Sequence, residues 1–331
     1  MAKQPTNSLY INDQPRDDFN TLVVRWLSGQ TRVKEHQPTK AFGGALTLLD
    51  AAINSSLAEG LDLKGATRKT LSGLTTFMFA QSLDDALGHL SAEMINEGGF
   101  RSARSQGFAK NWGENFVNSI VYLLARAYEH HPDVIVAKGT PRPLRARLEA
   151  TRLVPLHGNQ EAISISIESD LCIFRRDDPE RCVIVNAKTR LKEVFHIGTM
   201  WALLFDIMTD PVLRTRFGMV ADQALDRRKA RYVFATADSV NSGGAKTQGA
   251  DVERDAPRNL IKMDALFFDY VFVSKEGIGH VARELNTHQT REAVFHELGC
   301  IIDLIDEIVV ASEQPPLSGR ERDDLPLIAN R

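Results

Sequence analysis

The sequence predicts an α/β protein in which a helical N-terminal region precedes a core of strands and helices. Three observations support this class. Apolar residues recur at helical spacing through the first third of the chain, strand-like segments follow after residue 160, and further helical patterns separate those strands. The 331 residues, 43% of them hydrophobic, are enough to build a sizeable core in one or two domains.

The N-terminal third is helical in pattern. Gly44–Ala58, Thr67–Leu87 and Trp112–Tyr128 place apolar residues three and four positions apart, and glycines separate the segments. The first 20 residues are polar and predict a loose arm. We therefore expect a helical region over residues 1–137.

Strand patterns begin after a basic segment that starts at Lys138. A helical pattern follows the third strand from Thr189 to Met208, and Arg291–Val310 predicts an amphipathic helix that packs in the core. The core is therefore expected over residues 138–312, followed by a disordered tail over residues 313–331. The expected strands are Ala162–Ile167, Asp170–Phe174, Cys182–Val185, Arg231–Ala235 and Ala265–Val273.

Composition and motifs exclude several classes of protein. A formal net charge of -3 excludes a histone-like basic protein, and three scattered cysteines exclude a disulfide framework. The chain has no secretory leader pattern and no apolar run long enough to cross a membrane, so we expect a cytoplasmic protein without a membrane partner. It also lacks a dinucleotide fingerprint, a complete P-loop and the usual serine hydrolase and zinc protease motifs, so no nucleotide cofactor is expected.

One pair of strands brings an acid and a lysine together. If Asp170–Arg176 and Cys182–Lys188 form an antiparallel hairpin around Pro179, Asp170 and Lys188 are equally far from the turn and lie side by side. Asp170 then shares a face with Cys172, and Asn186 shares one with Lys188. A carboxylate and the backbone carbonyl of Ala187 can hold Mg²⁺, which activates water for phosphodiester cleavage. The lysine can orient that water or neutralise the developing charge; the alternative is a surface salt bridge.

These residues resemble a known signature. Glu168-Ser169-Asp170 followed by LCIF, a turn and VIVNAK is similar to the PD-(D/E)xK nuclease motif over Ile163–Asp206, most of all to type II restriction endonucleases near the branch that reads CCGG sites. The resemblance implies a mixed central sheet flanked by helices, a Mg²⁺ cofactor, and cleavage of double-stranded DNA at a short palindromic site by a homodimer.

The chain departs from that motif at two positions. Ser169 replaces the proline, and Asn186 replaces the first acid of (D/E)xK, so it offers a neutral oxygen or a hydrogen-bond donor but no charge. A third carboxylate must then come from elsewhere. We favour Glu193, whose rival role is contact with cytosine amino groups; the other candidates are Glu168, Asp206, Glu161 and Glu149.

DNA contacts are expected from several basic residues. Arg190 and Lys192 follow the motif at the start of a helix, and Arg254 and Arg258 lie in a long polar loop over residues 238–259. The basic segments 138–152 and 214–231 are either solvated surfaces or phosphate contacts. Two alternatives stay open beside a restriction enzyme: a structure-directed repair or junction nuclease of the same fold, and a non-catalytic DNA-binding protein on a decayed nuclease fold.

Overall fold

The fold is seen in a computed structural model of the chain. It describes residues 39–74, 113, 116–156, 159–188, 195–221, 223–237, 267–274 and 295–311. The expected tail over residues 313–331, the loop over residues 238–259 and the N-terminal arm lie outside these ranges.

The centre of the described fold is a six-stranded mixed sheet with the strand order β1-β4-β5-β7-β8-β9. β1, β4 and β5 pair antiparallel, whereas β5, β7, β8 and β9 run parallel to one another. The six strands are β1 (Val134–Lys138), β4 (Leu171–Arg175), β5 (Cys182–Lys188), β7 (Ala230–Thr236), β8 (Val271–Val273) and β9 (Phe295–Glu297).

Both faces of this sheet are covered, because side chains alternate along each strand and both sets are apolar. On β5, Val183 and Val185 face one core cluster, while Cys182 and Ile184 face the other. All seven residues of β7 are buried. Continuous burial of this kind is typical of strands with helices on both sides.

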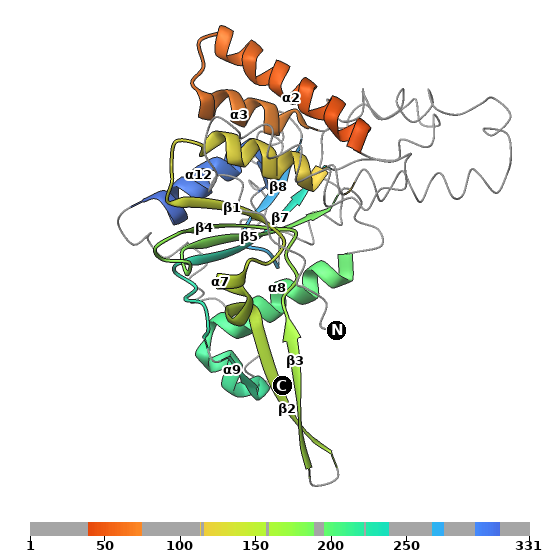
Figure 1. The fold of residues 1–331 in the computed structure, drawn as a ribbon. Coiled ribbons are helices and arrows are strands. Elements are labelled where there is room, and N and C mark those ends of the chain that lie inside the picture. Colours follow the sequence, from red (N-terminus) through yellow and green to blue (C-terminus); the bar gives the residue numbers. More distant parts are fainter. Residues whose placement is uncertain are drawn as a thin grey trace, which may run out of the picture.

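The helices form one layer on each face of the sheet (Figure 1). One layer shares a core cluster with Val183 and Val185, and it contains α2 (Thr39–Ala58), α3 (Leu63–Ser72), a helix over residues 116–127, and α12 (Ile301–Ile305) with the π-helical turn η5 (Asp306–Val310). The opposite layer contains α7 (Arg142–Arg145), the 3-10 turn η3 (Ala146–Leu148) and α8 (Phe195–Thr209). The expected α/β class with a central mixed sheet flanked by helices is therefore confirmed.

A second, three-stranded sheet has the order β3-β2-β6. Its long hairpin of β2 (Glu149–Leu156) and β3 (Asn159–Ser166) extends away from the central sheet (Figure 1). β6 (Met219–Val220) pairs with β2 after the short helix α9 (Pro211–Phe217), which begins at an Asp210 cap and ends at Gly218. β3 matches an expected strand. β2 does not, because its basic residues had pointed to a solvated helix.

Two further expectations about the elements differ from the structure. The segment Arg291–Val310 is not one helix: Phe295–Glu297 forms β9 along the edge of β8, and the helical turns begin at Leu298. The apolar spacing fits a helix throughout, but the open edge of β8 gives the first residues a strand partner. Of the strand expected over Ala265–Val273, Val271–Val273 forms β8, residues 267–270 are turn and loop residues, and residues 265–266 lie outside the described ranges.

The helical region and the sheet also share one core. The expected boundary between residues 137 and 138 falls inside β1, whose five residues pair with β4. Side chains of α2, α3 and the helix over residues 116–127 belong to the same hydrophobic cluster as Val134 and Val136 of β1. Within the described residues, the N-terminal helices are thus a layer of the α/β fold.

Candidate active site

The candidate site lies at one end of the central sheet, where β4 begins and β5 ends. Asp170 directly precedes β4, and Lys188 is the last residue of β5. The Lys188 ammonium lies 3.0 Å from Asp170 Oδ2 and 3.3 Å from Oδ1. The backbone N–H of Ala187 donates to the same Oδ2 at 2.8 Å. The acid and the lysine are therefore in direct contact, and both side chains are 21% exposed.

The contact arises from a register that differs from the expected one. β4 and β5 pair with Leu171 opposite Val185 and Phe174 opposite Cys182. Continued by one residue, this register places Asp170 opposite Asn186, and Lys188 lies two residues farther along β5. A shift of two residues keeps every side chain on its expected face, whereas a shift of one would reverse them. Because lysine has a long side chain, Nζ reaches the carboxylate across this diagonal.

Backbone contacts hold Asp170 in place on its other side. Its carbonyl accepts from the N–H of Gly139, which follows β1 with a positive φ of 72°. The hydroxyls of Thr140 and Ser169 lie 2.8 Å apart. The end of β1 thus fixes the segment that presents Asp170, and α7 starts two residues after Thr140.

Asn186 is buried beside this pair. It is 1% exposed, and its Nδ2 lies 3.2 Å from the hydroxyl oxygen of Tyr232 on the neighbouring strand β7. The Tyr232 hydroxyl donates in turn to the carbonyl of Glu168 at 3.0 Å. Asn186 Oδ1 is buried and accepts no hydrogen bond within the part of the chain that the structure describes. Sequence reasoning singled out Asn186 but missed Tyr232, whose partners lie 46 and 64 residues away along the chain.

The pKa of Tyr232 is affected by burial and by the charges around it. Burial raises the pKa of its phenol well above the ordinary value; the hydrogen bond from Asn186 opposes the shift, and the nearby carboxylates of Asp170 and Glu168 add to it. Glu168 is exposed and lies two residues before Asp170. Of the acids considered as a further carboxylate beside Asp170, Glu168 is thus one whose charge acts close to the site.

The other acids are less available, or cannot be placed. Asp206 on α8 lies 3.0 Å from Arg227, which also pairs with the buried Asp269. Glu193, Arg190 and Lys192 lie outside the described residues, as do Arg254 and Arg258. The structure therefore brings together Asp170, Asn186, Ala187 and Lys188 and leaves the other expected site residues unplaced.

The donors that are described fit a hard cation in kind but not in number. Carboxylate and amide oxygens are ligands that Mg²⁺ accepts. Asn186 Oδ1, which is buried and has no hydrogen-bond partner among the described residues, is free to be such a ligand atom. Among the described residues, however, no group of three or more His, Cys, Asp or Glu side chains could hold a metal ion. A complete set needs a further carboxylate, from Glu168 or from Glu193.

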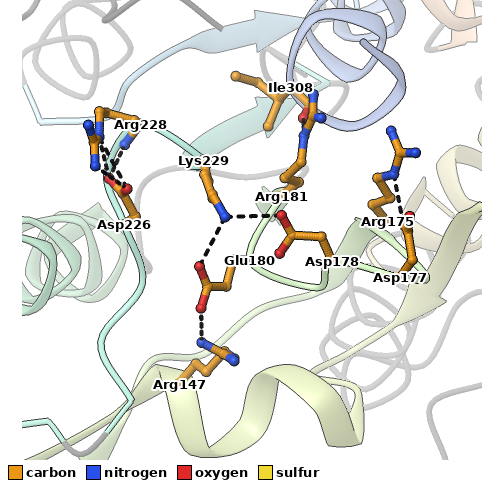
Figure 2. Close-up of polar contacts among 10 residues, drawn as sticks. All are labelled: Arg147, Arg175, Asp177, Asp178, Glu180, Arg181, Asp226, Arg228, Lys229 and Ile308. Carbon is orange, nitrogen blue, oxygen red and sulfur yellow. Dashed lines mark hydrogen bonds and ion pairs between the residues drawn. The ribbon is translucent and has the colours of Figure 1, made fainter. Parts of the chain in front are cut away.

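The last residues of the second basic segment, 228–231, make contacts within the protein. Lys229 lies 3.0 Å from Asp178 and 3.4 Å from Glu180, while Arg228 pairs with Asp226 (Figure 2). Arg231 is 1% exposed and donates to the carbonyls of Arg227 and Ala230. At the far end of the sheet, these three cations are therefore engaged by acidic side chains or backbone carbonyls of the protein.

Comparisons with known proteins give little beyond the geometry. No family model matches the chain, and no curated protein matches it. Among solved structures, a chain in a complex of the restriction endonuclease PspGI with its substrate DNA is similar, with 13% sequence identity and a TM-score of 0.44 over 80% of this chain and 93% of that chain. No helix in the described ranges is long and apolar enough to cross a membrane. At this level of similarity, the chemistry must be argued from the residues themselves.

Proposed function

We propose that this chain is a Mg²⁺-dependent endonuclease that cleaves double-stranded DNA at a short palindromic site, as a type II restriction enzyme of a restriction-modification system does. One observation carries the proposal: the contact between Asp170 and Lys188 at the open end of the sheet, with the Ala187 N–H on the same carboxylate. The acid and the lysine of the signature are 18 positions apart in the sequence, and the hairpin brings them together at one end of the sheet.

The residues divide the chemistry between them. Asp170, the carbonyl of Ala187 and a second acid, Glu193 or Glu168, would hold Mg²⁺. When bound there, Mg²⁺ lowers the pKa of a water molecule and offsets charge on the scissile phosphate. The Lys188 ammonium, held by Asp170, orients the attacking water and stabilises the negative charge that develops on the phosphate.

Two exposed arginines support contact with a polyanion. Arg142 and Arg145 on α7 are exposed and have no acidic partner among the described residues. Arg142 follows Gly139, which bonds to the Asp170 carbonyl, by only three residues, a span of at most about 11 Å. A DNA backbone lying across the Asp170 end would be within their reach. Because a palindrome has two-fold symmetry, we propose a homodimer, acting in the cytoplasm.

A non-catalytic DNA-binding protein is the second candidate, and one observation favours it. Lys188 and the Ala187 N–H already satisfy the Asp170 carboxylate, and Asn186 adds no charge beside it. Such a protein binds DNA equally in Mg²⁺, Ca²⁺ or chelator and never cuts it.

The test is a digest of phage and plasmid DNA by the purified protein with Mg²⁺ and with EDTA, alongside Lys188→Ala. We expect discrete fragments that require both Mg²⁺ and Lys188. A smear or nicking on linear duplex of random sequence would indicate a structure-directed nuclease. Binding without cleavage under any metal would reject the nuclease and leave the second candidate.

A further inference from the structure

Tyr232 connects two parts of the candidate site. It projects from β7 to the Glu168 carbonyl, two residues before Asp170, and it contacts the Asn186 amide on β5. Its ring is stacked between Phe205 and Phe268, with centroid separations of 5.5 and 5.4 Å. The hydroxyl is therefore held by packing on both faces of the ring.

The direction of each hydrogen bond follows from the donors available. A phenol has one hydrogen and a backbone carbonyl has none, so the Tyr232 hydrogen must point at the Glu168 oxygen. A phenol keeps its hydrogen at neutral pH, because its ordinary pKa is about 10. The Tyr232 oxygen then only accepts, and the Asn186 group that faces it must be the NH₂.

This arrangement sets the orientation of the Asn186 amide. With Nδ2 toward Tyr232, Oδ1 points away, and it is buried without a hydrogen-bond partner among the described residues. Unsatisfied buried acceptors are rare in folded proteins and call for an explanation. The Asn186 side chain lies on the same face of β5 as Lys188, and the register of β4 and β5, continued by one residue, places Asn186 opposite Asp170.

We propose that Tyr232 is a positioning residue that orients the Asn186 amide so that Oδ1 serves as a neutral oxygen ligand to a divalent cation held by Asp170. This rests on the proposed metal-dependent function and deepens it. The amide oxygen takes the place of a carboxylate oxygen, and the tyrosine supplies the orientation that a symmetric carboxylate does not need.

The test is a titration of the full-length chain with Mn²⁺ alone, with free Mn²⁺ followed by electron paramagnetic resonance. Tyr232→Phe keeps the stacked ring and removes only the hydroxyl. We expect it to weaken Mn²⁺ binding about tenfold, as the loss of a group that orients a ligand does. In an Asn186→Asp background, the same change should cost less than about twofold, because either oxygen of a carboxylate can serve as the ligand whichever way the group is turned.

Tyr128→Phe is the matched control. Tyr128 is buried, and its hydroxyl oxygen lies 3.0 Å from both the Ile302 carbonyl and Asp306 Oδ1 in the helical layer, so these two acceptors compete for its one hydrogen. It should match Tyr232→Phe in thermal stability and leave Mn²⁺ binding unchanged. An equal loss in the wild-type and the Asn186→Asp backgrounds would overturn the proposal, because Tyr232 would then act through the Glu168–Asp170 segment. Unchanged binding in Tyr232→Phe, or no Mn²⁺ binding by the wild type, would also overturn it.

The DNA digest separates this proposal from the proposed function. Cleavage by the wild type together with unchanged Mn²⁺ binding in Tyr232→Phe would reject the positioning role alone. The opposite result is a wild type that never cuts DNA, while Tyr232→Phe weakens Mn²⁺ binding in the wild-type background and not in the Asn186→Asp background. That result would support the positioning role and reject the nuclease.

Discussion

The two ends of the central sheet use the same kinds of residue in different ways. At the turn between β4 and β5, Glu180 joins Arg147 at 2.6 Å to Lys229 at 3.4 Å, and Lys229 also reaches Asp178 (Figure 2). Arg181, 8% exposed, donates to the Ile308 carbonyl near the end of the last helical turns. Each of these charged side chains has a partner in the protein, whereas Nε and Nη2 of the buried Arg231 at the start of β7 have no hydrogen-bond partner among the described residues.

The Asp170 end is not matched in this way. Its acid–lysine pair lies beside a buried amide oxygen without a partner and near two exposed arginines without an acid among the described residues. A network that satisfies itself stabilises the fold, whereas one with unused acceptors and donors is suited to a ligand. Because the buried Arg231 at the turn end also has unpartnered nitrogens, the difference between the two ends depends on the exposed Arg142 and Arg145 near the acid–lysine pair and not on unsatisfied atoms alone.

The largest expected effect comes from removing one lysine at each end. Lys188–Asp170 and Lys229–Asp178 are both 3.0 Å pairs, with side-chain exposures of 21%/21% and 25%/35%. Lys188→Ala should lower the rate of DNA cleavage by about 10³-fold, because a charge-stabilising donor is lost. Lys229→Ala should leave cleavage unchanged and lower the free energy of unfolding by about 1 kcal/mol.

Single-turnover cleavage rates and urea unfolding measure the two effects. DNA binding in the presence of Ca²⁺ should be nearly equal for both variants. If Lys229→Ala reduced cleavage as strongly as Lys188→Ala, the two ends would not differ in function and the site assignment would fail.

A smaller effect is expected from the arginines of α7. Arg142→Ala and Arg145→Ala should each weaken DNA binding and reduce the slope of log affinity against log salt by about 1, as the loss of one phosphate contact does. Arg228→Ala is the control, because Arg228 already pairs with Asp226 at the far end. Fluorescence anisotropy with a labelled duplex at several salt concentrations gives the slopes. Unchanged slopes for both α7 variants would place the DNA elsewhere.

Local sequence pattern predicts much of the sheet but little of what depends on distant partners. The alternation and apolar runs of β3, β4, β5 and β7 were sufficient to place these strands. β1 was missed although Pro132 separates it from the preceding helix, because VIVAK is only five residues long, and β9 was missed because its residues also fit a helical stripe. What makes each a strand is a neighbour far along the chain, which local periodicity does not contain.

The site shows the same division. The contact between Asp170 and Lys188 could be predicted from the hairpin. The actual register differs from the expected one by two residues, so both side chains still lie on the same face of the sheet. The orientation of Asn186 could not be predicted, since it depends on a tyrosine two strands from Glu168 and on which group carries a hydrogen. A single sequence contains no signal for such a relay beyond a tyrosine in a buried strand.

The smallest predicted effect tests whether the charges at the turn end only stabilise. The hydrogen bond from Arg228 lowers the pKa of Asp226 below its ordinary 3.8, against the opposing effect of burial. A carboxyl whose pKa is depressed on folding contributes stability above its ordinary pKa and loses it as pH falls through the folded value. Arg228→Gln should therefore cost about 0.5 kcal/mol of unfolding free energy near pH 7, and the difference from wild type should close below about pH 4.

Urea unfolding from neutral pH to about pH 3 measures this difference, with Arg145→Gln as a control that has no acidic partner in the described residues. The control should differ little from wild type at every pH. A wild-type advantage over Arg228→Gln that stayed constant into the acid range would mean that Arg228 acts through packing of its side chain and not through the Asp226 charge. In that case the turn end would owe its stability to close packing, and the contrast with the Asp170 end would rest on exposure and not on matched charge.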